Sequence, residues 1–162
     1  MPDPLLGPRE RLLMRAVTTE LVVKADERFG FVDLTQHLRR SVKEAAIADG
    51  CVVAFCAHTT CCLLINEWEE GALADLRRRI EVLVPSDDVY AHDDLQRRRQ
   101  NLEDGHERPN GRSHVAQMLL GGSSHAIPLS RGEPAFGRWQ RLLLLELDEP
   151  KERHVLMHVF GE

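Results

Sequence analysis

The alternation of hydrophobic and polar residues predicts a chain built from short strands and a few helices. Runs rich in Val, Leu, Ile and Thr that are bounded by turn residues are typical of strands. The expected strands cover residues 14–24, 51–57, 61–65, 124–129, 139–148 and 153–160. Helical spacing of apolar residues predicts longer helices over about 34–46 and 69–83 and a short helix over about 114–120.

The turns between these segments indicate how the strands pair. Residues 130–132 and 148–151 form short reversals, and strands joined by short reversals usually pair antiparallel. The expected fold is therefore α+β, with a predominantly antiparallel sheet or sandwich, two longer helices and one short helix in a single domain. Residues 1–12 are rich in proline and mixed in charge, so we expect a flexible tail there and the domain over residues 13–162.

The composition is that of a soluble globular protein. Hydrophobic residues make up 43% of the 162 residues and charged residues 29%, which excludes a disordered or membrane-embedded chain. No apolar run approaches the roughly 20 residues of a membrane span, and the first residues lack the basic start and apolar stretch of a secretory signal. We therefore expect a cytoplasmic protein without a membrane partner. The net charge of -5 disfavours nucleic acid as a partner.

The four cysteines lie within twelve positions and lack the paired spacing of a zinc site. Cys51 and Cys56 fall in an apolar run, where a reduced thiol packs as a small hydrophobic side chain. Cys61 and Cys62 are neighbours on an expected strand, so their side chains point to opposite faces and cannot bind one metal together.

Two arginine clusters, residues 77–79 and 97–99, are interleaved with acidic residues. Short charge runs of this kind usually cover solvated helix faces, and phosphate binding is the alternative. The polar segment 87–113, which contains the second cluster, is long for a connection. Long ordered loops tend to be functional.

The densest group of chemically active residues begins at His58-Thr59-Thr60, between two apolar strands. A strand end holds an imidazole and two hydroxyls at the rim of the core, where rigid backbone positions them against a ligand. The alternative is a histidine that is merely hydrogen-bonded in place.

Further motifs follow this group along the chain. In order, the motifs are His58-Thr59-Thr60, Asn66-Glu67, Val84-Pro85, Tyr90-x-His92, Asn110-Gly111-x-Ser113-His114, Gly121-x-Ser123, Gly137-x-Trp139-Gln140 and Glu146-Leu147-Asp148. Their order and spacing over roughly residues 15–160 resemble the YjbQ-like family, whose members are described as secondary thiamine-phosphate synthases. The resemblance implies a homotrimeric α+β protein with a polar, metal-binding pocket and a thiamine-phosphate synthase activity that can be secondary to an unknown main role.

Carried over to this sequence, the resemblance implies a divalent metal ion, zinc or magnesium, bound by His58, His92 and His114. Neutral imidazole nitrogen is a favoured zinc ligand, and a three-histidine site leaves one coordination position open for water or a substrate oxygen. The resemblance also places three residues with catalytic roles, as orienting groups or proton acceptors, in or beside the pocket. These are Asn66, Glu67 and Asp75. The expected substrate-binding residues are Thr59, Thr60, Ser123 and Gln140.

Each of these assignments has a structural alternative. Asn66 is also suited to cap the second helix, with Glu67 beside its positive end. Asp75 lies on a charged helix, His92 begins a polar loop, and His114 lies at the start of a short helix.

Strand geometry separates two further candidates. Gln140 and Glu146 lie six residues apart on one expected strand, so they share a face at about 20 Å and cannot both line one pocket. Gln140 is the better site residue, and Glu146 is expected to serve a neighbouring subunit or to face solvent. On the last strand, His154 and His158 share a face, which is expected to be its polar side.

The expected reaction joins a pyrimidine-methyl pyrophosphate to a thiazole phosphate and releases pyrophosphate, so the expected partner is a small phosphorylated substrate. Two alternatives stay open. An ion held by three histidines also activates water, which favours a hydrolase of phosphate esters. A non-catalytic, trimeric ligand-binding protein is the other alternative.

Overall fold

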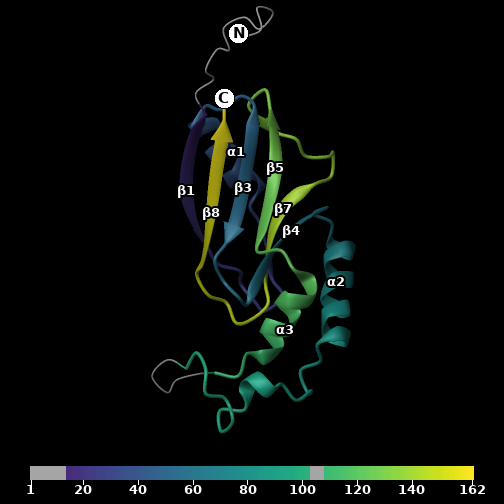
Figure 1. Ribbon diagram of the computed structural model, residues 1–162. Coiled ribbons are helices and arrows are strands. Elements are labelled where there is room, and N and C mark those ends of the chain that lie inside the picture. The colour runs from purple at the N-terminus through teal and green to yellow at the C-terminus, as the bar shows by residue number, and fades with distance from the viewer. Residues whose placement is uncertain (1–13, 103–107) are drawn as a thin grey trace, which may run out of the picture.

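The computed structural model describes residues 14–102 and 108–162, so the expected tail over residues 1–12 lies outside the described part of the chain. The strands are β1 (Arg15–Val23), β2 (Phe31–Asp33), β3 (Gly50–Cys56), β4 (Cys61–Asn66), β5 (Ser124–Ser130), β6 (Glu133–Pro134), β7 (Arg141–Glu146) and β8 (Arg153–Gly161). The helices are α1 (Thr35–Ala45), α2 (Glu70–Leu83) and α3 (Gly111–Leu120), with a short 3-10 helix η1 (Ala91–Asp93). Two antiparallel sheets, with the orders β1-β8-β3-β5-β6 and β2-β7-β4, form the body of the molecule (Figure 1).

The first core lies between the five-stranded sheet on one side and α1 and the three-stranded sheet on the other. Alternate residues of β3 and β8 point into it, as the pleat of a strand requires, and they pair across the sheet, Val52 with Val159 and Ala54 with Met157. From the helix and the second sheet come Leu34, Leu38, Val42, Ala45, Cys61, Leu63, Leu142 and Leu144. The apolar spacing that predicts the first helix is therefore its buried stripe.

The second core lies on the other face of the three-stranded sheet, against α2 and α3. Its buried members are Phe29, Cys62, Ile80, Val84, Ala116, Leu145 and Leu147. Cys61 belongs to the first core and Cys62 to the second, so the prediction that these neighbours point to opposite faces is confirmed. The β4–β7 pair is a middle layer with both faces buried, which explains its nearly continuous apolar sequence.

The α+β class, the antiparallel sheets and the three helices confirm the fold expected from the sequence. The predicted strands and helices are all present, with ends shifted by a few residues. β2 and β6 contain three and two residues, too few for a periodic pattern to reveal. No helix of the described residues is long and apolar enough to cross a membrane.

One inference about strand pairing is wrong. Residues 148–151 form a short reversal between β7 and β8, which predicts that these two strands pair. Instead, β7 pairs with β2 and β4, and β8 pairs with β1 and β3. Because β7 is apolar on both faces, it fills the middle layer, and the reversal carries the chain from one sheet to the other. The reversal at residues 130–132 does form a hairpin, but with the short strand β6.

The start of α2 also differs from expectation. Glu69 occupies the N-cap, and its carboxylate accepts hydrogen bonds from the backbone N–H groups of Gly71 (2.8 Å) and Ala72 (2.7 Å). Asn66 is not the cap, because its Oδ1 accepts from the backbone N–H of Glu67 at 2.8 Å. Glu69 satisfies two N–H groups that have no partner within the helix, so the capping role proposed for Asn66 is wrong.

Candidate functional site

Two of the predicted histidines come together where η1 meets the start of α3. The ring centroids of His92 and His114 lie 4.4 Å apart, with the ring planes inclined at 48°. Asp93 joins the two elements, because its Oδ1 accepts hydrogen bonds from the backbone N–H groups of Asn110 (2.9 Å) and Gly111 (2.8 Å). This carboxylate satisfies the first N–H groups of α3 and thereby positions both imidazoles.

Gly111 permits the close approach of η1 to α3. A Cβ at this position would lie 2.7 Å from Cβ of Tyr90 and 3.0 Å from Cβ of His92, well inside the roughly 3.5–4.0 Å at which carbon atoms make contact. The helix begins at Gly111, three residues before the predicted start at His114. Glycine is therefore the residue that fits this junction.

The surroundings favour a neutral His114. Burial lowers the pKa of His114, and the neighbouring His92 ring and the Arg98 guanidinium lower it further. Nη1 of Arg98 lies 3.0 Å from Nε2 of His92. Because a guanidinium only donates, Nε2 of His92 is the acceptor in this contact. His114 is thus suited to accept a proton near neutral pH.

A cavity of about 600 Å³ adjoins His92. Its lining consists of Ala91, His92, Arg97, Arg98, Arg99, Gln100 and Asn101. Arg98 also donates to the carbonyl oxygens of Gln100 (3.1 Å) and Asn101 (2.8 Å), which fixes the backbone of the loop beside the cavity. Arg97 pairs with Asp94 at 3.4 Å. This arginine cluster lies outside any helix, so its interpretation as a solvated helix face is wrong.

The first turn of α3 is anchored to the protein interior by two side chains. Ser113 Oγ donates to the carbonyl oxygen of Leu147 at 2.8 Å, and Arg112 Nε donates to the carbonyl oxygen of Val84 at 2.6 Å. Both side chains are buried. These two hydrogen bonds fix the backbone directly before His114 and so hold its imidazole in place.

A second polar cluster is buried next to the connection between β3 and β4. Arg153 donates from Nε to Oε2 of Glu146 (2.7 Å) and from Nη2 to Oε1 (2.5 Å), and Nη2 also donates to Thr60 Oγ1 at 3.0 Å. Glu146 is 0% exposed, so the expectation that it faces solvent or a neighbouring subunit is wrong. The sequence-based assignment omits Arg153, although it shares the buried face of β8 with Val155. A buried arginine requires an acidic partner. The position of Arg153 on the apolar face of the last strand could therefore have indicated a buried ion pair.

His58 has a different histidine as its neighbour. Its Nε2 accepts a hydrogen bond from the backbone N–H of His154 at 2.9 Å, and the two ring centroids lie 6.0 Å apart. On the exposed side of β8, Nδ1 of His154 lies 2.6 Å from Oε1 of Glu20. Burial lowers the pKa of His58, and the positive charge of Arg153 and the ring of His154 lower it further.

The β4–β7 ladder separates two groups of predicted residues. Its register pairs Cys61 with Glu146 at one end and Asn66 with Arg141 at the other. Thr60 adjoins the first end, and the residues at the second end, all exposed, are Asn66, Glu67 and Gln140. The argument that Gln140 and Glu146 cannot line one pocket is therefore confirmed.

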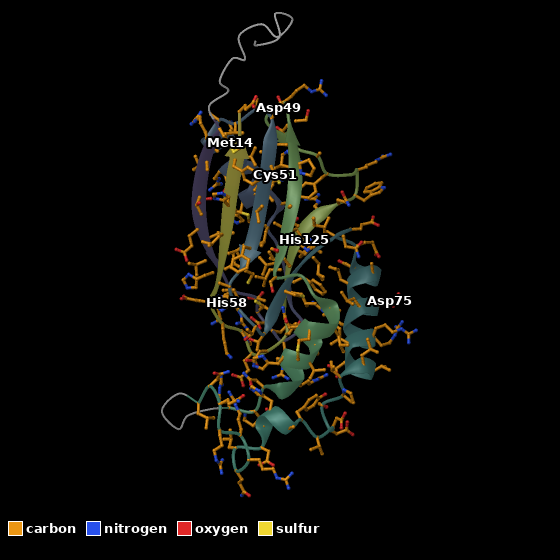
Figure 2. All side chains as sticks on the ribbon, viewed as in Figure 1. Met14, Asp49, Cys51, His58, Asp75 and His125 are labelled. Carbon is orange, nitrogen blue, oxygen red and sulfur yellow. The ribbon has the colours of Figure 1, made fainter. Side chains whose placement is uncertain are left out.

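The remaining predicted residues are Asp75, Thr59 and Ser123. Asp75 is exposed on α2 and pairs with Arg78 at 2.7 Å, and Figure 2 shows it on a different side of the molecule from His58. Thr59 is exposed. Ser123 Oγ accepts a hydrogen bond from Gln117 at 3.1 Å.

The three predicted metal ligands are thus found in two places. His92 and His114 adjoin each other, whereas His58 adjoins His154. Within residues 14–102 and 108–162, no three His, Cys, Asp or Glu side chains are grouped so as to hold a metal ion. A divalent ion on three histidines stays a prediction from the resemblance.

The sequence relationships agree with this arrangement of elements. The family model described as "UPF0047 protein YjbQ-like" matches residues 19–162, from within β1 to the end of the chain. The chain belongs to the YjbQ-like family. Membership in the YjbQ-like family confirms the resemblance drawn from the ordered motifs.

YjbQ-like relatives match most of the chain. A UPF0047 protein of Archaeoglobus fulgidus is 36% identical over 138 residues, which cover 85% of this chain and 97% of the relative. A UPF0047 protein of Methanothermobacter thermautotrophicus is 29% identical, with 93% and 96% covered. The crystal structure of a YbjQ-like protein of unknown function from Sulfolobus solfataricus matches with a TM-score of 0.79 at 28% identity, covering 93% of this chain and 100% of that chain. The YjbQ-like fold is therefore common to these proteins along nearly their whole length.

Proposed function

We propose that this YjbQ-like protein binds a small phosphorylated substrate in the cavity beside His92 and His114. The observation that carries the proposal is the lining of this cavity by residues 97–99, three consecutive arginines. Guanidinium groups match both the charge and the geometry of phosphate oxygens. The chain as a whole has a net charge of -5, so the positive charge at this cavity is local. Binding of an anionic ligand explains it.

The activity we propose is of the thiamine-phosphate synthase type. In this reaction the bond between the pyrimidine-methyl carbon and a pyrophosphate oxygen breaks, and a bond from that carbon to the thiazole nitrogen forms. The arginine side chains would stabilise the negative charge that develops on the departing pyrophosphate. His114 would exchange protons with the substrates, since its lowered pKa keeps it neutral.

A divalent metal ion, zinc or magnesium, is part of this proposal. His92 and His114 would offer two imidazole nitrogens, which suit zinc better than magnesium. Such an ion would supply Lewis-acid stabilisation of phosphate oxygens. Because Nε2 of His92 is hydrogen-bonded to Arg98, binding through this nitrogen requires the Arg98 side chain to move.

A homotrimer is proposed from the uncovered face of the five-stranded sheet. Its outward residues on β3 and β8 are Cys51, Val53, Phe55, Leu156, His158 and Phe160. Phe55 is 40% exposed, and no other described element covers this face (Figure 1). Association of copies would remove this apolar surface from water. Within one chain, the predicted site residues Asn66, Glu67 and Gln140 lie at the far end of the β4–β7 ladder. If they act at the cavity, a second copy of the trimer would supply them.

Two other functions compete with the synthase proposal. A hydrolase of phosphate esters would use the same arginines, with His114 accepting a proton from water. A non-catalytic protein would bind the anion without turnover. We place each of these in the cytoplasm, because phosphorylated substrates do not cross a membrane unaided.

Incubation of the purified protein with both substrates, with and without zinc or magnesium, tests the proposed activity. Thiamine phosphate and pyrophosphate are expected in equal amounts, and Arg99→Gln should reduce both. Arg79→Gln, on the exposed face of α2, is the matched control and should leave the rate unchanged. Release of phosphate from simple esters without ring coupling would favour the hydrolase. Pyrophosphate binding without either product would contradict both enzymatic proposals.

A further inference from the structure

Two cysteines bring their sulfur atoms together beside the His58-Thr59-Thr60 connection. Cys56 ends β3 and Cys61 begins β4, and their Sγ atoms lie 3.3 Å apart. Both residues are buried, with 1% and 0% of their surface exposed. Both are free thiols, and a disulfide would require the two sulfur atoms to approach by only about 1.3 Å.

The other two cysteines have different surroundings. Cys62 points into the second core, on the opposite face of β4 from Cys61. Cys51 lies near the other end of β3, where its Sγ is 3.7 Å from the carbonyl oxygen of Val52. They therefore serve as internal controls of the same residue type.

Electrostatics distinguishes the two members of the pair. The Cys61 thiol donates a hydrogen bond that lowers the pKa of Cys56, against the raising effect of burial, and the backbone N–H of His58 and the charge of Arg153 lower it further. This hydrogen bond and burial raise the pKa of Cys61. The 3.3 Å separation of the two Sγ atoms, rather than the pKa of either thiol, brings a disulfide within reach.

We infer that Cys56 and Cys61 form a redox-active dithiol, which a small two-electron oxidant such as hydrogen peroxide converts to an intramolecular disulfide. First, one of the two sulfurs attacks a peroxide oxygen: an S–O bond forms, the O–O bond breaks, and the departing hydroxide combines with the proton that this thiol released. Second, the other sulfur attacks the sulfenic sulfur: the S–S bond forms, the S–O bond breaks, and hydroxide leaves with the proton of the second thiol. In total, two thiols are oxidised and one peroxide is reduced to two water molecules.

The disulfide would close a small ring around the connection between β3 and β4. This connection carries His58, whose Nε2 accepts from the N–H of His154, and Thr60, whose Oγ1 accepts from Arg153. A covalent bond between the two strand ends would restrict the movement of these groups. The inference is independent of the ligand proposed for the arginine-lined cavity.

Peptide mapping of the folded protein after treatment with hydrogen peroxide tests the inference. After denaturation and alkylation, we expect the four alkylatable thiols to fall to two, with one peptide pair linked through Cys56 and Cys61. Reduction with dithiothreitol should restore all four thiols. Cys62→Ser and Cys51→Ser should each retain the linkage.

The pair is tested by Cys61→Ser, which should lose the linkage and stop at a sulfenic acid on Cys56, which dimedone traps. Cys56→Ser should lose the linkage as well. If a variant fails to fold, peptide mapping of the wild-type protein still tests the inference. Four intact thiols at a peroxide concentration that oxidises the urea-unfolded chain would overturn the inference. A linkage between chains, or one that includes Cys62, would overturn it as well.

Discussion

The two polar clusters of this protein both contain arginine but differ in how deeply their groups are buried. In the closed cluster, Glu146, Arg153 and Thr60 are buried and bind one another. In the open cluster, His92 lines a cavity together with three arginines, and its ring adjoins that of His114. A buried, paired cluster that a ligand cannot reach supports the fold, whereas guanidinium and imidazole groups that line a cavity are accessible to a ligand.

Breaking the closed cluster should have the largest effect. Glu146→Gln leaves Arg153 buried without a counter-charge, so we expect the free energy of unfolding to fall by about 3–5 kcal/mol. Arg78→Gln, which removes the exposed pair with Asp75, should change it by less than about 1 kcal/mol. Urea denaturation measures both. Equally small decreases in the free energy of unfolding of the two variants would contradict the proposed difference between the buried and the exposed ion pair.

Filling the junction of the open cluster should have an intermediate effect. Gly111→Ala places a Cβ against Tyr90 and His92, and we expect a loss of about 1–3 kcal/mol in the free energy of unfolding. Gly71→Ala, in the first turn of α2, meets only the movable carboxylate of Glu69 and should change stability by less than about 1 kcal/mol. Thermal or urea unfolding of the pair is the measurement. An unaffected Gly111→Ala would mean that η1 does not pack tightly on α3.

Protonation of the open cluster should have the smallest effect. Because the folded protein lowers the pKa of His114, the unfolded chain binds a proton more readily. The resulting stability is complete above a pH of about 6.5 and is lost as the pH falls below it. His114→Gln should therefore show a shallower decline of unfolding free energy between about pH 7 and pH 5 than the wild type. Parallel profiles would show that His114 does not titrate differently in the folded protein.

The sequence predicts those strands and helices whose apolar residues recur with a regular period. The alternation in β8 identifies its buried face through Val155 and Met157, and the stripe from Leu38 to Val42 identifies α1. The pairing of β7 was not predictable in this way, because a strand that is apolar on both faces gives no indication of its neighbours. The short reversal after it was therefore misinterpreted.

The predictable part of the candidate site was smaller. The motifs point to His92 and His114, and the structure brings these two rings together. They do not reveal that Arg98 donates to His92, nor that Arg153 pairs with Glu146. The Arg98 contact lies in a polar segment without periodicity, and the Arg153 contact joins two different sheets. Both follow from tertiary packing rather than from residue spacing.

Calorimetric titration of inorganic pyrophosphate tests most directly whether the open cluster is a ligand site. We expect one binding site per chain, with a Kd that rises about tenfold in Arg97→Gln and in Arg99→Gln, a loss of about 1.4 kcal/mol in binding free energy each. Arg98 is left intact because it holds the loop. Arg79→Gln should bind as the wild type does. Equal affinities in all four proteins, or no binding by the wild type, would contradict the account.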